Sequence, residues 1–444
     1  MKQDIPGTIM FDGTQAQKGL ALNRMCFSFN SAENRAAFVR DEDAYCRKFG
    51  LSEEQRAAVR SRSVLKMIEA GGNVYYLAKL AGIFGLNVQD IGAQQTGTSV
   101  DEFKAKLVAA AAADSKVLPL QPRTVERRQI QDRTGITRIG GAAHGLRILE
   151  SGHQRTTTMA RIIGGIASTH VPAIGKAIAE NKQNDPYWKP FFKGFDYVHY
   201  WLAREKPDVA VVFYNDHGLN FFLDKLPTFA VGAASEYRNE DEGWGIPVSR
   251  SVPGDPALSW HLINALVADE FDITMCQEML IDHAVTIPMT LMWPGQRWPV
   301  KIVPVSINTV QHPLPSLARC LKLGRSIGRA LESYQQDLRV MIIGTGGLSH
   351  QLDGERAGFI NKEFDELCLD KIVNDPEALT RYSIHDWVEL AGAQGVEFLN
   401  WMAMRGALTG EVTQVHRNYH IPISNTAAAT IVLENGSRAQ RSAA

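Results

Sequence analysis

Short apolar, β-branched segments alternate with helical segments along most of the chain from Met159 onward. The clearest strand-like runs are MARIIGGIAS, VAVVFYND, KIVPVSIN and RVMIIGTGG, which begin at residues 159, 209, 301 and 339. Helical stretches such as PALSWHLINALVADEF lie between them. Because strands that alternate with helices build a sheet covered by helices, we predict an α/β domain with a central sheet over residues 159–444.

The first 113 residues have a different, helical character. Ser52 followed by Gln55 forms a capping-box pattern, which predicts one helix that continues to a stop at Gly71 and Gly72. A second helix is predicted over NVYYLAKLAGIFG (73–85). We therefore expect a small all-α domain over residues 1–113 in front of the α/β domain.

Residues 114–158 resemble neither of these parts. The segment has no sustained hydrophobic period, many arginines, several glycines and a run of threonines at its end. These features predict a linker. Met159, which opens the first strand-like run, has the character of a former start codon, so the chain reads as two proteins joined in one.

Charge and cysteine content exclude several classes of protein. The 444 residues carry 47 Lys+Arg and 48 Asp+Glu, a formal net charge of −1. Such a balance provides no field for nucleic acid or an anionic membrane surface, and no apolar run is long enough to span a bilayer. The five cysteines are scattered, with no CxxC pair, which is typical of reduced thiols. We expect a cytoplasmic protein that binds neither nucleic acid nor membranes.

Histidines follow three of the predicted strands directly. IIGGIASTH ends at His170, VAVVFYNDH at His217 and RVMIIGTGGLSH at His350. A fourth, His283, precedes an apolar stretch in MLIDHAVTIP. Sites in open α/β sheets form at the carboxyl ends of strands, and histidine is the commonest metal ligand. The shared position of these four histidines predicts a metal or catalytic site.

Glu397 is an acid within the otherwise apolar helical stretch GVEFLNWMAM. A buried carboxylate is costly unless it is paired or bound to a metal. Two histidines and one carboxylate with open positions form the pattern of non-haem Fe(II) oxygenases, and the same ligands could hold Zn(II) in a hydrolase. The residues alone leave both metals open. We interpret GTGG (344–347) as a tight turn that presents His350, because it lacks the remainder of a phosphate-loop motif.

Longer motifs carry a resemblance to one family. RIIGGIASTHVPAIG, FYNDHG, DEGWGIP, IGTGGLSHQLDGERAGFINKEFD, GVEFLNWMAMRGAL and YHIPISNTA together resemble the catalytic subunits of the protocatechuate 4,5-dioxygenases, which are class III extradiol ring-cleaving enzymes. KGLALNRMCFSFN, GGNVYYLAKLAGIFG and QTGTSVDEF are similar to the small subunit of the same enzymes. The resemblance covers nearly the whole chain outside the predicted linker.

The resemblance implies a role for each matching residue. His170, His217 and Glu397 would be the ligands of Fe(II). His350 would be the acid and base, and His283 a second active-site histidine.

The substrate contacts follow from the same motifs. Ser424, in the HIP-x-SNT motif, would contact the carboxylate of the substrate. We also expect Asn215, in the FYNDHG motif, to contact substrate. No further organic cofactor is implied.

The implied activity is cleavage of protocatechuate by dioxygen, beside rather than between its hydroxyls, to 4-carboxy-2-hydroxymuconate semialdehyde. That reaction belongs to aromatic catabolism, including that of lignin-derived acids. The alternative closest in chemistry is cleavage of gallate or 3-O-methylgallate. Two more distant alternatives are a Zn(II) hydrolase and a non-catalytic binding protein. We also expect a homo-oligomer such as a dimer. In the family, the two parts are separate chains or are fused with the catalytic part first, whereas here the small helical part comes first.

Overall fold

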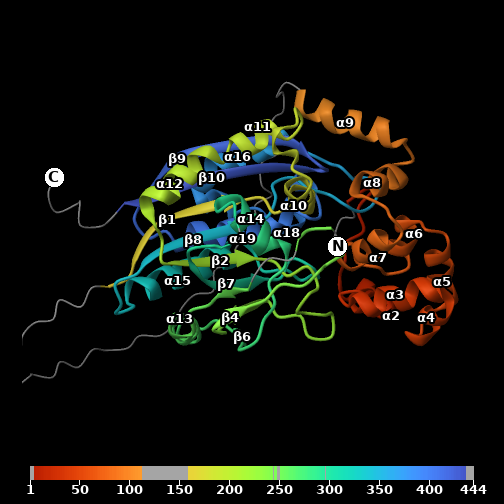
Figure 1. Cartoon of the computed structure of the whole chain (residues 1–444), viewed down its shortest axis with the longest axis horizontal. Helices are drawn as coiled ribbons and strands as arrows, with labels where there is room; N and C mark the ends of the chain where they lie inside the picture. The colour runs from red at the N-terminus through yellow and green to blue at the C-terminus, as the bar shows by residue number, and fades with distance from the viewer. Residues whose placement is uncertain (1–4, 113–158, 244, 248–250, 296, 437–444) are drawn as a thin grey trace, which may run out of the picture.

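A helical part and an α/β part pack side by side in the computed structural model of the chain, which describes residues 5–112, 159–243, 245–247, 251–295 and 297–436. The predicted fold class, a small all-α region ahead of an α/β domain with a central sheet, is confirmed. The predicted linker lies outside the described residues. In Figure 1 the helices of the first part, red to orange, gather at one end of the sheet.

Short helices make up the first part, called the cap below (residues 5–112). The helix predicted over 73–85 is present as α7. The single helix predicted from residue 53 to Gly71 is wrong, because Arg62 adopts a left-handed conformation (φ 59°) and the Ser63 side chain caps a new helix. The helices are α1 (Gly13–Lys18), α2 (Leu20–Ser28), α3 (Ala32–Arg40), α4 (Glu42–Lys48), α5 (Glu53–Arg60), α6 (Val64–Glu69), α7 (Val74–Ile83), α8 (Val88–Thr96) and α9 (Val100–Ala112).

The apolar core of the cap continues into the α/β part. Phe222 and Val310, both from the α/β part, are buried in the same cluster as the cap residues Phe29 and Leu77. The amide of Asn73 also donates to the Val310 carbonyl at 3.1 Å. The cap is therefore held against the α/β part of its own chain by a shared core rather than by a polar contact surface alone.

A mixed, 8-stranded sheet forms the centre of the α/β part, with the strand order β6-β3-β7-β2-β8-β1-β10-β9. Each of the four predicted strands is present. The strands are β1 (Arg161–Ser168), β2 (Val209–Tyr214), β3 (Phe229–Gly232), β6 (Thr274–Cys276), β7 (Lys301–Ile307), β8 (Arg339–Thr345), β9 (Glu411–Ile423) and β10 (Thr426–Gly436), and a separate short pair consists of β4 (Glu236–Tyr237) and β5 (Val252–Pro253).

Three neighbouring strands of the sheet are parallel. β8 lies between β1 and β2 and pairs in parallel with both, with Gly344 opposite Ala167 on one side and Phe213 on the other. Their carboxyl ends therefore meet at one edge of the sheet. The loops that leave this edge carry His170, His217 and His350.

Helices cover both faces of the sheet, so the α/β part has three layers (Figure 1). Side chains of β2 alternate between the faces: Val211 and Phe213 join one core, and Val212 and Tyr214 the other. The first core includes α13 (Pro256–Ala268), α15 (Leu317–Glu332), α16 (Lys362–Asn374), α17 (Pro376–Leu379), α18 (Ile384–Ala391) and α19 (Phe398–Ala407). The second includes α10 (Pro172–Ala179), α11 (Lys189–Lys193), α12 (Asp196–Glu205) and α14 (His283–Met292), and short 3₁₀ turns are η1 (Lys182–Asn184) and η2 (Gly395–Glu397).

The long antiparallel hairpin β9–β10 closes one side of the sheet and was not foreseen from the sequence. Its two turn residues, Ser424 and Asn425, join strands that are almost entirely paired. Ser424 has a left-handed backbone (φ 56°), which a two-residue hairpin turn requires. The turn thus places Ser424 beside the same edge of the sheet as the histidine loops, since His350 forms a bridge with Thr426.

All five cysteines are free, as predicted. Among the described residues, no helix is both long enough and apolar enough to cross a membrane.

Candidate metal centre and active site

His170 and Glu397 meet at the carboxyl edge of the sheet. The Nε2 atom of His170 lies 3.3 Å from a carboxylate oxygen of Glu397, and both side chains are almost fully buried. The other ring nitrogen of His170 is 3.1 Å from the Thr345 hydroxyl, at the end of β8. That contact holds the ring so that Nε2 faces the carboxylate.

His217 approaches the same carboxylate from the end of β2. Its Nε2 atom lies 3.5 Å from the other oxygen of Glu397. The carboxylate of Asp282 accepts hydrogen bonds from the His217 backbone N–H at 2.7 Å and from its Nδ1 at 3.0 Å. Burial disfavours the charged imidazolium, but the Asp282 and Glu397 carboxylates outweigh burial and raise the pKa of His217 to about 10.

Glu397 lies at the junction of η2 and α19, where the chain turns toward the sheet edge. Its carboxylate accepts hydrogen bonds from the Tyr75 hydroxyl at 3.1 Å, the Asn215 amide at 3.3 Å and the Gly347 backbone N–H at 3.3 Å. Burial opposes ionisation, yet the charge and hydrogen bond of His170 lower the pKa of Glu397 well below its usual value. The carboxylate is therefore an anion at neutral pH.

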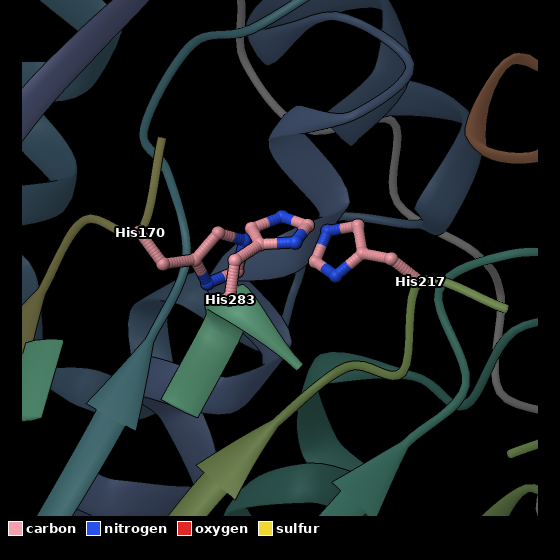
Figure 2. A group of neighbouring side chains, drawn as sticks. All are labelled: His170, His217 and His283. Atoms are coloured by element: carbon pink, nitrogen blue, oxygen red, sulfur yellow. The ribbon is translucent and has the colours of Figure 1, made fainter. Parts of the chain in front are cut away.

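His283 opens α14 and lies beside the two other histidines (Figure 2). Its ring centroid is 4.1 Å from that of His217 and 5.6 Å from that of His170. Nitrogen atoms of the three rings lie within 4.8 Å of one another. The Glu242 carboxylate accepts from both the backbone N–H and Nδ1 of His283, each at 2.8 Å, so the ring is held in one orientation.

The donor set of His170, His217 and Glu397 fits a divalent cation. Nitrogen and carboxylate ligands of this kind suit iron and zinc. The Nδ1 atom of each histidine is held by an outer partner, Thr345 or Asp282, which is how metal-binding histidines are usually oriented.

His350 is brought to the same cavity by the turn after β8. Gly346 has a φ of 130° and lies against Glu397, where a side chain would collide with the Glu397 backbone. The chain leaves β8 just before this glycine and passes close to Glu397. Burial lowers the pKa of His350 to about 4, and Nδ1 has no hydrogen-bond partner among the described residues. Its imidazole is therefore neutral at pH 7 and free to accept a proton.

Ser424 and Asn215 occupy different positions relative to the cavity. The Ser424 side chain lines the cavity, and its hydroxyl accepts a hydrogen bond from the Gln89 amide of the cap at 3.2 Å. Asn215 is fully buried behind the histidines, where its amide contacts Glu397 and Asn400. The structure thus places Asn215 as a support of Glu397.

Cap residues that the sequence analysis did not single out complete the cavity. Tyr75 and Lys79 lie four residues apart on α7, and both line the cavity with the histidines and Glu397. Their signal in the sequence was weak, because α7 has one lysine and two adjacent tyrosines among apolar residues, and nothing in that pattern singles out Tyr75 or Lys79. Other cavity residues are Val64, Val74, Leu77, Ala78, Ala81, Val88 and Ile91 from the cap, and Thr169, Val171, Pro172, Gly347, Leu352 and Thr426 from the α/β part.

Curated relatives of the chain are dioxygenases. It is 43% identical over 200 residues to a gallate dioxygenase of Pseudomonas putida, which covers 45% of this chain and 58% of the relative. It is 36% identical over 162 residues, 36% of this chain and 48% of the relative, to a 2,3-dihydroxyphenylpropionate/2,3-dihydroxicinnamic acid 1,2-dioxygenase of Photorhabdus laumondii. The chain thus spans about half the length of these relatives.

Two family models match the chain in succession. Residues 22–108 match the LigA subunit of the aromatic-ring-opening dioxygenase LigAB. Residues 164–429, more than half of the chain, match the catalytic LigB subunit of aromatic ring-opening dioxygenase. The histidines and Glu397 lie within the second match, and the first match covers most of the cap. The chain therefore belongs to the family of catalytic LigB subunits of aromatic ring-opening dioxygenase, with a LigA-type part ahead of the catalytic part in the same chain.

Proposed function

We propose that the chain is an Fe(II)-dependent extradiol dioxygenase that cleaves protocatechuate between C4 and C5. The observation that carries the proposal is the convergence of His170, His217 and Glu397, each with an outer partner, in a buried cavity. Family membership favours this chemistry over the hydrolase that the same ligands could also serve.

His170, His217 and Glu397 would hold the iron. Bound there, Fe(II) would offer open positions to the catechol oxygens and to dioxygen and let electrons pass from the ring to the oxygen. Thr345 and Asp282 would keep the two imidazoles oriented toward the metal.

His350 would move the protons of the reaction. Its neutral imidazole can take a proton from a ring hydroxyl and later return it as the ring opens. His283, fixed by Glu242, would orient the substrates beside the metal. Ser424 would bind the ring carboxylate through its hydroxyl.

The cap would exclude water while the reaction proceeds. Its contribution to the cavity wall is mostly aliphatic, and Tyr75 reaches the carboxylate of Glu397. A dry cavity strengthens the electrostatic interactions within it and protects reactive species from hydrolysis.

Oxygen uptake tests the proposal directly. Protein loaded with Fe(II) under anaerobic conditions should consume one dioxygen per protocatechuate and form the yellow ring-fission product. Protein shown to contain one iron per chain that neither consumes dioxygen nor forms this product would exclude the proposal. Hydrolysis of an ester or amide by the Zn(II)-loaded protein, without uptake of dioxygen, would favour the hydrolase.

Gallate is a second candidate substrate, because the relative in Pseudomonas putida is a gallate dioxygenase. Gallate differs from protocatechuate by one ring hydroxyl, so the same site could hold either. Measured kcat/KM values for protocatechuate, gallate and 3-O-methylgallate would decide among them, with the highest value identifying the preferred acid.

A further inference from the structure

Lys79 is a buried cation in the wall of the cavity. It lies on α7, and only 4% of its surface is exposed. Lysine is rarely buried to this extent unless its charge has a partner. Among the described residues that line the cavity, Lys79 is the one lysine or arginine.

The charge of Lys79 has no anionic partner within the described residues. Its ammonium donates one hydrogen bond, to the His217 backbone carbonyl at 3.1 Å, and forms no ion pair with an aspartate or glutamate there. An ammonium group has three N–H donors. Two of them thus have no partner within the described residues.

Burying an ammonium group without an anion costs free energy. An anion supplied by a ligand in the cavity would offset that cost. The proposed substrate has anionic oxygen in its ring carboxylate and, once a proton is lost, in a ring hydroxyl. We infer that Lys79 binds an anionic oxygen of the aromatic substrate and that the cap thereby takes part in substrate recognition. This inference rests on the proposed function.

Lys79 could instead serve only as a tether between the cap and the His217 loop. The neighbouring contact argues against that reading, because the Asn30 amide already donates to the Gly218 carbonyl at 2.8 Å. A neutral side chain therefore suffices to hold this loop to the cap. Lys79 and Asn30 each donate to a backbone carbonyl of the same loop, and Lys79 differs from Asn30 in carrying a charge.

Three variants separate charge from tethering. Lys79→Gln keeps a donor for the His217 carbonyl but removes the charge, Lys79→Arg keeps the charge, and Asn30→Ala removes only the neutral tether. Calorimetry on the metal-free protein would measure the affinity for 3,4-dihydroxybenzoate, its neutral amide and catechol. Steady-state oxygen uptake with iron-loaded protein would give KM and kcat for the acid and for catechol.

We expect Lys79→Gln to weaken binding of the acid and raise its KM roughly tenfold to a hundredfold, the loss typical of a hydrogen bond to a charged group. Its kcat should change far less. Lys79→Arg should restore most of the affinity, and Asn30→Ala should change it less than about threefold.

The three ligands identify which oxygen is bound. A loss confined to the acid assigns Lys79 to the carboxylate. An equal loss of affinity for all three ligands, which Lys79→Arg restores, assigns Lys79 to a ring hydroxyl.

Unchanged binding in Lys79→Gln, or a loss of affinity that Lys79→Arg does not restore, would overturn the inference. If the Gln variant does not fold, Lys79→Met, which keeps the aliphatic part of the side chain without the charge, takes its place, and unchanged binding in that variant would overturn the inference too. Wild-type protein that binds the acid but consumes no dioxygen would count against the proposed function alone.

Discussion

At the scale of single residues, the candidate site is a set of imidazoles held by outer partners. Asp282 shows how one side chain does two tasks: one carboxylate oxygen caps α14 through the Ala284 N–H, and the other holds His217. Glu242 does the same for the backbone and ring of His283. His350 differs, because its Nδ1 has no partner among the described residues. A group left unpaired in a cavity is available to substrate.

Replacing His350 should separate catalysis from metal binding. His350→Ala should lower kcat by roughly 10²–10⁴-fold, the range for loss of a general acid–base. Iron content should remain near that of wild type, because His170, His217 and Glu397 keep their own partners. Metal analysis and oxygen uptake on the same samples would check both expectations.

His261 is a suitable control for that variant. It lies on α13 and bonds the Ala330 carbonyl at 2.8 Å, outside the cavity. His261→Gln should leave kcat within about twofold. If His350→Ala retained wild-type turnover, the acid–base role would be wrong.

The pH behaviour of His350 is a second expectation. Burial lowers its pKa from 6.5 to about 4, so the folded protein keeps this imidazole neutral at pH values where the unfolded chain is protonated. The resulting contribution to stability is present above pH 6.5 and is lost as the pH falls from 6.5 toward 4. An NMR titration of metal-free protein, with the resonance assigned through His350→Gln, should give a midpoint below 5. A midpoint near 6.5 would contradict it.

At the scale of elements, close packing of α15 on α19 positions Glu397. Gly324 and Gly328 of α15 face the backbone of α19, and a Cβ atom at Gly324 would lie 2.0 Å from the Ala403 carbonyl oxygen. Only a residue without a side chain allows this approach. Because Glu397 immediately precedes α19, the depth of that helix decides where the carboxylate lies.

Gly324→Ala tests this link between packing and the site. The added methyl group meets backbone rather than a flexible side chain, so α19 must shift, and we expect a loss of about 1–3 kcal/mol in the free energy of unfolding. Affinity for the metal should fall with it. Denaturant unfolding and calorimetric metal titration would measure the two effects.

Gly13→Ala is the matched control, because nothing lies within 4 Å of a Cβ atom there. It should leave the metal affinity unchanged and the free energy of unfolding unchanged or raised by up to about 1 kcal/mol, because alanine favours the helix over glycine. Unaltered metal affinity in a destabilised Gly324→Ala protein would show that α19 does not set the position of Glu397.

At the scale of the whole molecule, the cap is a structural part of the cavity. Gln95 of the cap donates to the Leu352 carbonyl at 2.9 Å and accepts from the Gly354 N–H at 2.8 Å, two and four residues after His350. Phe103 and Leu107 of α9 pack against Ile360 farther along the same segment. The cap thus contacts the loop that carries the proposed acid and base, and none of these contacts needs the chain between residues 112 and 159.

Two separate chains should therefore assemble. Residues 1–112 and 159–444, expressed together, should copurify and show kcat within about twofold of the fused protein, since the shared core contains residues of both parts. Activity should fall on dilution, unlike that of the single chain. Tag-based copurification and oxygen uptake over a range of concentrations would measure this. Failure of the parts to associate would mean that the connection is essential for docking.

The sequence by itself determined four of the strands and the residues that follow them. Apolar, β-branched runs that end in His170, His217 and His350 can be read directly, because side-chain hydrophobicity and chain order are local properties. The helix after Gly71 could also be predicted, since it depends on a few neighbouring residues. The end of the helix at Arg62 could not be predicted. The residues around it have a helical pattern, and the left-handed conformation of Arg62 and the cap at Ser63 override that pattern.

Only the tertiary structure decided which distant residues meet. Strand order placed β8 between β1 and β2 and so gathered three histidines, and α15 packs closely against α19, the helix that Glu397 precedes. Tyr75 and Lys79 reach the cavity because the apolar core of the cap continues into the α/β part, which no local pattern reveals. Contacts of this kind depend on packing between segments far apart in the chain, whereas strands and turns depend on their own residues. The alternating strands thus predicted the edge at which the site forms, and packing decided what completes it.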